Sequence, residues 1–284
     1  MTFSIVAFDK KTREWGIAVQ SKFVAVGAVV PFAVAEVGAI ATQALANTSY
    51  GPKGLTLLNM GFTARQTIDI LTKDDKEKEQ RQIGIIDKYG NPASFTGEEC
   101  FDWAGHVIGE NYCCQGNILA SENVVKDMAR SYENTSGDLI DKLFAALESG
   151  QAAGGDKRGR ESAAILIVKE KGAYDGGTDI YVDIRVDEHP YPIKELRKVF
   201  EVYDLCILNR EDPDDILELK GDVLKKVKEV LKNSGFYSGK IDGTYDTQTK
   251  EALTKWLHTN NFEAKERNDE YIWGSIYRYM TKTN

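Results

Sequence analysis

Hydrophobic residues begin almost at the start of the chain and form two short runs on either side of a polar turn. The runs span 3–7 and 15–19, and the turn between them reads Asp9-Lys10-Lys11-Thr12. Short apolar runs bounded by a polar turn are typical of the two strands of a hairpin. The sequence therefore predicts a hairpin that starts at residue 2, where most chains have a few poorly ordered residues.

Up to about residue 206, short apolar runs alternate with longer stretches in which apolar residues recur at helical spacing. A second hairpin is expected around the glycine-containing turn at 88–91, and Pro31 interrupts the third apolar run. The further expected strands are 25–37, 38–46, 82–87, 92–96, 163–168 and 180–186, and the expected helices are 50–60, 64–71, 122–131 and 137–149. Groups of strands separated by helix pairs predict an α+β fold, with two antiparallel sheets packed face to face and covered by pairs of helices.

The pattern changes after a short charged segment, 209–215, which contains Pro213 and is typical of a domain boundary. We predict one domain at 1–208, a linker at 209–216 and a second, small three-helix domain at 217–284. The apolar residues expected on the buried faces of these helices are Leu217, Leu219, Val223, Leu224, Val227, Val230, Leu231, Ala252, Leu253, Trp256, Leu257, Ile272, Trp273, Ile276, Tyr279 and Met280.

Composition narrows the class of protein. The 284 residues are 42% hydrophobic, which is ample material for a core. No membrane span or secretory signal is predicted, so the expected compartment is the cytoplasm. A formal net charge of −8 argues against nucleic acid or an anionic membrane as partner, because phosphate groups need a basic face.

Cysteine and histidine spacing gives no sign of a metal site or a disulfide framework. The cysteines include an adjacent pair and form no C-x-x-C motif, and the histidines are far apart in the sequence. We therefore expect buried thiols, structural histidines and no cofactor. These residues are Cys100, Cys113, Cys114, Cys206, His106, His189 and His258.

Thr2 is the first candidate for chemistry. A threonine hydroxyl needs a base to act as a nucleophile, and a free α-amine, with a pKa of about 7.7 to 8, can serve when threonine is the first residue. Removal of Met1 is favoured because the residue that follows it is small. Threonine also suits the start of a strand, so a catalytic and a purely structural role both stay open.

Six segments carry a resemblance to a known family. They read TFSIVA from residue 2, WGIAVQSKFVAVGAVVPFA from 15, ATQALANTSYGPKGL from 41, FTGEECFDWAGH from 95, QGNILA from 115 and GQAAGGDKRGRESAAILIV from 150. Over residues 1 to about 206 the chain resembles the family of domain of unknown function 1028, a group similar to N-terminal-nucleophile (Ntn) hydrolases. This resemblance implies a four-layer αββα sandwich and hydrolysis of an amide bond by Thr2 at the end of a central strand, and it implies no particular substrate.

The resemblance also gives Lys22 a role, because it stands near the charged residue that ends the equivalent hairpin in proteasome-type relatives. A lysine there would keep the Thr2 amine neutral and stabilise an oxyanion. Gln20 stands about where those relatives have an aspartate, so the chain departs from their pattern. As an alternative, Lys22 marks only the edge of a strand.

A glycine-rich stretch, GGDKRGRESA, brings Asp156, Arg158 and Arg160 together between a helix and a strand. Two arginines at this spacing favour a loop that binds a substrate carboxylate, since a guanidinium holds a carboxylate through two hydrogen bonds. A solvated turn is the alternative.

Neutral polar residues stand in small or apolar surroundings at two further places, ANTSYG and QGN. We expect Asn47 to support catalysis and Ser49 to contact substrate. Gln115 and Asn117 are of the same type, and such groups either fix a ligand or satisfy buried backbone. An acid/base cluster of Glu98, Glu99, Asp102 and His106 is a weaker hypothesis, and we favour charged surface there.

The segment GFYSGKIDGTYDTQTKEALTKWL, from 235 to 257, is similar to the peptidoglycan-binding-like three-helix domain. Asp246 is expected to cap the following helix through its carboxylate. A groove beside Tyr237 and Tyr245 would suit a glycan or peptide, because aromatic faces bind both. The alternatives are a protein-docking role for the domain and core packing for the two tyrosines.

Two functions therefore stay open. The first is an Ntn-type amidohydrolase that cleaves a small-molecule or peptide amide, with Thr2 supported by Lys22 and Asn47. The second is a noncatalytic Ntn-fold scaffold for ligand binding or assembly, with the tail as a docking module. In either case we expect a homo-oligomer, because the small-residue third strand and the outer helices offer surfaces that can pack between subunits.

Overall fold

The computed structural model describes residues 2–208 and 210–282. The chain divides into two compact units between Val199 and Phe200, and each unit is described by itself. Met1, on whose removal a catalytic Thr2 depends, and Asn209, the first residue of the predicted linker, lie outside the described residues. The predicted domain limits stay predictions.

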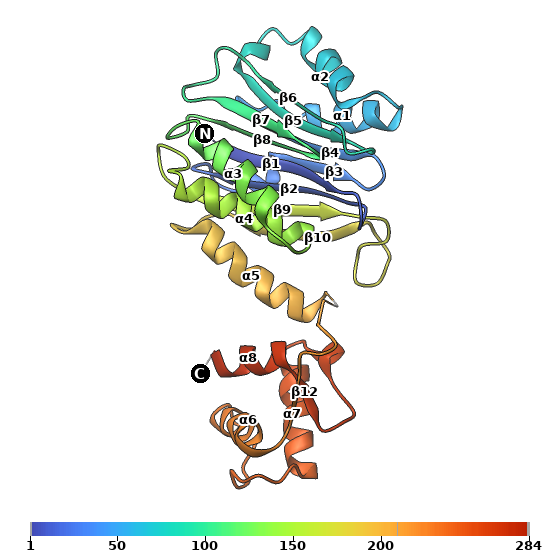
Figure 1. Ribbon diagram of the computed structural model, residues 1–284, viewed down its shortest axis with the longest axis vertical. Coiled ribbons are helices and arrows are strands. Elements are labelled where there is room, and N and C mark those ends of the chain that lie inside the picture. Colours follow the sequence, from blue (N-terminus) through green and yellow to red (C-terminus); the bar gives the residue numbers. More distant parts are fainter. Residues whose placement is uncertain (1, 209, 283–284) are drawn as a thin grey trace. The chain divides into compact units, whose positions relative to one another are not determined.

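The first unit contains two antiparallel sheets (Figure 1). The larger has six strands in the order β10 (Ile180–Val186), β9 (Ser162–Val168), β2 (Glu14–Ser21), β1 (Thr2–Asp9), β8 (Tyr112–Asn117) and β7 (Gly105–Gly109). The smaller has the order β3 (Pro31–Val34), β4 (Gly38–Ala44), β5 (Arg81–Asp87) and β6 (Pro92–Thr96).

Helices cover the outer faces of the two sheets (Figure 1). The pair α3 (Asn123–Asn134) and α4 (Leu139–Ala152) packs on β1, β2 and β8. The pair α1 (Tyr50–Asn59) and α2 (Ala64–Lys73) packs on strands of the smaller sheet. Short 3-10 turns occupy Val26–Ala28 and Lys78–Gln80. The α+β class and the helix pairs outside two facing sheets agree with the sequence prediction.

The alternation of side chains along β1 and β2 decides which residues meet. Val6 and Ile17 belong to the apolar cluster between the two sheets. The opposite face packs on α4, where Gly150 lies against the Phe3 ring and Gly16 lies against Leu143. Since successive side chains point to opposite faces, Thr2 and Ser4 share the face that looks toward the other sheet.

Three elements that begin in the first unit were not predicted: two strands, and a helix that extends past Val199. The hairpin of β7 and β8 lies where no strand was expected, because short, glycine-bounded segments give a weak strand signal. Helix α5 (Pro192–Cys206) was also missed. Its signal was present in the sequence, with Pro192 at the first helical position and apolar residues at 193, 196 and 200. None of the described helices has the length and apolar character needed to cross a membrane.

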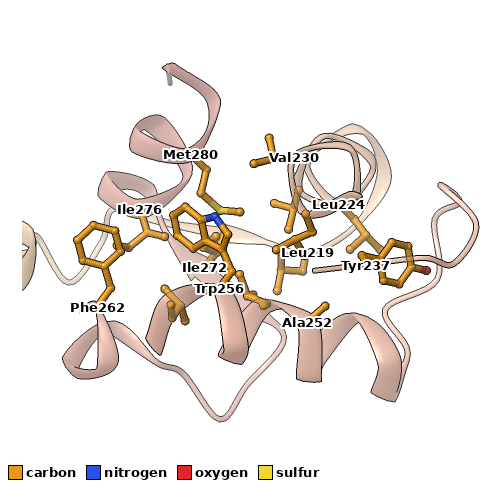
Figure 2. Packing of buried hydrophobic residues seen from close by; sticks show 14 of the residues in the cluster. Leu219, Leu224, Val230, Tyr237, Ala252, Trp256, Phe262, Ile272, Ile276 and Met280 are labelled. Carbon is orange, nitrogen blue, oxygen red and sulfur yellow. The ribbon is translucent and has the colours of Figure 1, made fainter. Parts of the chain in front are cut away.

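The second unit contains the three predicted helices, α6 (Gly221–Asn233), α7 (Thr247–Thr259) and α8 (Gly274–Lys282), and a 3-10 turn at Glu263–Lys265. The assignment of Leu217, Leu219, Ile272 and Trp273 to helices was wrong: Leu219 precedes α6, and Trp273, the last residue of the strand that contains Ile272, precedes α8. The positions of Leu217 and Ile272 show where the pattern misled. These two residues lie in β11 (Ile216–Glu218) and β12 (Tyr271–Trp273), which pair with each other. Figure 2 shows Trp256 in the core that these elements enclose.

Candidate functional site

Thr2 lies at the start of β1, in the interior of the six-stranded sheet. It pairs with Ser21 of β2 on one side and Asn117 of β8 on the other. The Thr2 side chain is only 6% exposed, and its Oγ1 lies 3.1 Å from the Ser21 Oγ. The first described residue of the chain is thus buried between two polar neighbours.

A polar layer extends from Thr2 into the space between the sheets. The Ser4 hydroxyl donates to Gln43 Oε1 (2.7 Å), and Gln43 Nε2 donates to Gln82 Oε1 (2.8 Å). Gln115 Nε2 donates to Ser4 Oγ at 2.7 Å. All four side chains are buried. Of the four, only Gln115 was singled out from the sequence. The other three could have been found as polar residues at inward-facing positions of predicted strands.

A pocket of about 440 Å³ opens at this end of the sheets. Asn117, the cross-strand neighbour of Thr2, is part of its wall and is otherwise buried. The Asn117 Nδ2 donates to Gln82 Oε1 at 2.9 Å. The other lining residues are Ala44, Leu45, Gln80, Glu99, Cys100, Phe101, Ile118 and Arg158.

The loop before β9 brings two of the predicted substrate-binding residues to the same region. The buried Asp156 carboxylate accepts hydrogen bonds from the backbone N–H of Lys22 (3.0 Å) and of Arg158 (2.8 Å). Two backbone N–H groups from separate segments thereby share one carboxylate. Asp156 thus holds the loop against the end of β2, while the Arg158 side chain lines the pocket.

The side chains of Lys22 and Arg160, the other charged candidates, make their contacts away from Thr2 and the 440 Å³ pocket. The Lys22 ammonium pairs with Glu161 at 2.7 Å, and its side chain is 40% exposed. This contact does not support the predicted role of Lys22 beside the Thr2 amine. The Arg160 guanidinium stacks over the Tyr191 ring, 4.7 Å from its centroid, and lines a separate pocket of about 280 Å³. Arg158 and Arg160 therefore do not face one ligand site.

Asn47 lines another pocket, of about 650 Å³, together with residues of α1 and α2, and Ser49 is not among the lining residues. Asn47 Oδ1 accepts the Ser49 hydroxyl at 2.8 Å, and Asn47 Nδ2 lies 3.4 Å from Asp75 Oδ2. The same Asp75 carboxylate accepts the Tyr50 hydroxyl (2.5 Å) and Arg81 Nε (3.0 Å). These contacts give Asn47 a place in a part-buried charge cluster.

The electrostatics of this cluster are strongly perturbed. Hydrogen bonds from Arg81 and Tyr50 hold the pKa of Asp75 well below its usual range. Burial and the same carboxylate raise the pKa of Tyr50. The ionised form of Asp75 is therefore favoured, and it stabilises the guanidinium beside it.

The remaining candidates have structural surroundings. Gln20 faces the helix layer, fully buried, and neither polar atom of its side chain has a hydrogen-bond partner among the described residues.

The residues of the weaker acid/base hypothesis are held by separate neighbours. His106 Nδ1 lies 2.9 Å from Thr96 Oγ1, and burial lowers the pKa of this histidine. Glu98 donates its backbone N–H to Glu79, and Glu99 accepts Gln80 at the rim of the 440 Å³ pocket. The Asp102 carbonyl accepts the Lys157 ammonium.

Comparison with known proteins gives the first unit a family. Residues 2–196 match the family model described as "Family of unknown function (DUF1028)". The chain belongs to the DUF1028 family. No curated protein matches the sequence.

Two of the solved structures found by comparison with this DUF1028 protein match it with different strength. One is a crystal structure of the DUF1028 protein SPO2555 from Silicibacter pomeroyi, which is 29% identical, covers 72% of this chain and 86% of its own, and has a TM-score of 0.66. The other is Anbu (ancestral beta-subunit) from Yersinia bercovieri, at 15% identity, 70% and 93% coverage and a TM-score of 0.33. The second score is too low to show a shared fold.

The second unit of the DUF1028 protein matches another family. Residues 206–280 fit the model described as "Putative peptidoglycan binding domain". Tyr237 lies in the core, with its hydroxyl donated to the Lys240 carbonyl at 3.0 Å, and Tyr245 packs against the same core. Core packing accounts for both rings, and a glycan, peptide or protein partner for this unit stays a prediction.

Proposed function

We propose that the first unit is an amidohydrolase of the Ntn type, built on a four-layer αββα sandwich. Thr2 is its nucleophile and, once Met1 is removed, its base. The observation that carries this proposal is the placement of Thr2: its hydroxyl is buried in an interior strand, and the neighbouring strand contributes Asn117 to the wall of a pocket.

The proposed reaction needs no group outside the chain except substrate and water. Thr2 Oγ1 attacks the carbonyl carbon of the amide, and its proton passes to the free α-amine. Collapse of the tetrahedral intermediate breaks the C–N bond, and the leaving amine takes that proton. Water, deprotonated by the same α-amine, then cleaves the acyl ester and restores the hydroxyl.

Two polar neighbours support these steps. The Ser21 hydroxyl, 3.1 Å from Thr2 Oγ1, orients the nucleophile. An amide nitrogen carries two hydrogens, and within the described part of the chain the Asn117 Nδ2 is hydrogen-bonded to Gln82 alone. The second hydrogen is therefore a candidate donor to the developing oxyanion.

An electrophilic probe tests the proposal without knowledge of the substrate. A β-lactone should acylate Thr2 in protein whose free Thr2 amine has been verified by mass spectrometry, and not in protein that retains Met1. Thr2→Ser should still be labelled, whereas Thr2→Val should lose labelling, and any amide turnover, by about 10³-fold or more. A panel of N-acyl and peptide amides then identifies the substrate.

The control is another buried threonine. Thr67 in α2 is fully buried, and its hydroxyl has no hydrogen-bond partner among the described residues. Thr67→Val should leave labelling unchanged. Absence of labelling in verified Thr2 protein, or labelling at another residue, would overturn the hydrolase proposal and favour a noncatalytic scaffold.

A further inference from the structure

Gln82 lies at the centre of the polar layer between the two sheets. It is fully buried at the start of β5. Its Nε2 lies within hydrogen-bonding distance of the Gly116 carbonyl (2.7 Å), Thr96 Oγ1 (3.0 Å) and the Gly105 carbonyl (3.2 Å). Its Oε1 accepts from Gln43 Nε2 and Asn117 Nδ2. One side chain thus joins the smaller sheet to β7 and β8.

The backbone carbonyls fix which way the Gln82 amide points. A carbonyl oxygen only accepts hydrogen bonds, so Gly116 and Gly105 require the nitrogen of the amide on their side. With the amide reversed, Gln82 Oε1 would face the Gly116 oxygen at 2.7 Å with no hydrogen between them. The Gln82 oxygen must therefore face Gln43 and Asn117.

This orientation dictates the orientation of the neighbouring side chains. Because Gln82 offers only an oxygen to them, Gln43 and Asn117 must both present their nitrogens. Gln43 then presents its oxygen to Ser4, and the hydroxyl of Ser4, having donated to Gln43, accepts from Gln115. The direction of every donor in the layer follows from the carbonyls that Gln82 contacts.

The layer ends at Thr2 and Asn117. Gln43 Nε2 lies 3.4 Å from the Thr2 carbonyl, and Asn117 Nδ2 is held by Gln82 at the wall of the pocket. In a buried network each hydrogen bond has few competing partners, so the positions of these two residues are tightly constrained.

We infer that Gln82 is a positioning residue of the proposed active site, which fixes the Asn117 amide so that its nitrogen faces the reacting carbonyl of an amide substrate. This inference rests on the proposed function, because it needs Asn117 to act in the proposed reaction. Gln82 itself does not contact the substrate. Gln82 acts through Asn117, and its loss lets the Asn117 amide rotate.

The experiment uses the full chain with a verified free Thr2 and measures β-lactone labelling as kinact and KI separately. Asn117→Ala should lower kinact by about 10²-fold, because one oxyanion donor is removed. Gln82→Met, which keeps the length of the side chain but makes no hydrogen bonds, should lower kinact by about tenfold or more through misplacement, with little change in KI. In the double variant the second substitution should add almost nothing.

A matched control separates positioning from general damage to the core. Gln20→Met replaces a fully buried glutamine that has no hydrogen-bond partner among the described residues, on the opposite face of the sheet from Thr2. It should leave kinact and KI unchanged. Circular dichroism under the labelling conditions reports the folded fraction, which partial unfolding of Gln82→Met would have to lower about as much as kinact to explain the slower labelling. That result, or additive effects in the double variant, would overturn the inference.

A spectroscopic readout keeps the inference testable apart from catalysis. In protein labelled with ¹⁵N-asparagine, the Asn117 side-chain amide should exchange slowly with solvent, and Gln82→Met should accelerate its exchange while Gln20→Met does not. If wild-type protein is not labelled by the lactone but shows this pattern, the proposed function fails and the positioning contact stands. Rapid exchange in the wild type would overturn the positioning inference itself.

A second variant serves where Gln82→Met does not fold. Thr96→Val removes one acceptor of Gln82 and should accelerate exchange of the Asn117 amide, and lower kinact, by less than Gln82→Met.

Discussion

At the scale of single residues, the buried Asp156 and the part-buried Asp75 act through the donors that surround their carboxylates. Asp156 accepts two backbone N–H groups and holds a loop, whereas Asp75 accepts Tyr50 and Arg81 and forms a charged cluster. A carboxylate that is removed from water needs such partners, because an unpaired buried charge is strongly unfavourable.

Asp75 should make the stability of the first unit depend on pH. Its pKa in the folded protein lies below the ordinary value, so this stabilisation is present above about pH 4 and is lost as the pH falls further. Asp75→Asn should lower the free energy of unfolding by about 1 to 2 kcal/mol at pH 7, because Arg81 then keeps only Glu77, at 2.5 Å and with a side chain 58% exposed, as its charged partner.

Urea unfolding of both proteins between pH 7 and pH 3 measures this effect. The gap in unfolding free energy between wild type and Asp75→Asn should narrow as the pH falls. Asp74→Asn, at the exposed neighbouring position, should show only a small gap at pH 7. A gap for Asp75→Asn that stays constant over this range would contradict the assignment.

At the scale of elements, side-chain caps mark where two of the described helices begin. Thr63 and Gln66 form a reciprocal capping box at α2, and the Asp246 carboxylate accepts the Thr249 backbone N–H (2.8 Å) at the start of α7. The second contact confirms the cap expected from the sequence. The Asp246 signal lies within four residues of the chain, which is why the sequence alone revealed it; the capping box at Thr63, of the same short range, was not predicted.

Removal of the cap of α7 should weaken the second unit by a modest amount. Asp246→Ala leaves the Thr249 N–H without its acceptor and should lower the melting temperature of the second unit by a few degrees. Asp246→Asn keeps an oxygen acceptor and should lose less. Hydrogen exchange at peptides from α6 and α7, read by mass spectrometry during thermal unfolding, compares the two variants. Equal losses would show that charge, and not the hydrogen bond, gives the cap its effect.

At the scale of the whole molecule, the second unit encloses its own small core, with Trp256 at its centre (Figure 2). Truncation of a buried tryptophan typically costs about 3 to 5 kcal/mol, which is a large part of the stability of so small a unit. We therefore expect Trp256→Ala to unfold residues 217–282 and to leave the first unit folded.

Hydrogen exchange read by mass spectrometry tests this in the full chain. Peptides from α6, α7 and α8 should lose protection in Trp256→Ala, while peptides from β1 and β8 keep theirs. Loss of protection in both units would show that they fold together. A conservative variant, Trp256→Phe, should retain protection throughout.

The sequence alone predicted the features that depend on neighbouring positions. Alternation and helical spacing indicated the α+β class, the hairpin of β1 and β2 and the helices on both sides of the boundary, since a buried face repeats every two or about 3.6 residues. The quoted segments identified the DUF1028 family, and the short-range cap at Asp246 was visible. The β7–β8 hairpin gave too weak a pattern to be predicted.

Tertiary structure alone decided which polar residues meet. Arg158 and Arg160 are two positions apart but line different pockets, and Gln82 meets Asn117 only because the two sheets pack with one register. No spacing along the chain records these contacts, because the partner of a side chain is set by strands that are distant in sequence. Packing likewise turned Tyr237 into the core and placed Lys22 on Glu161.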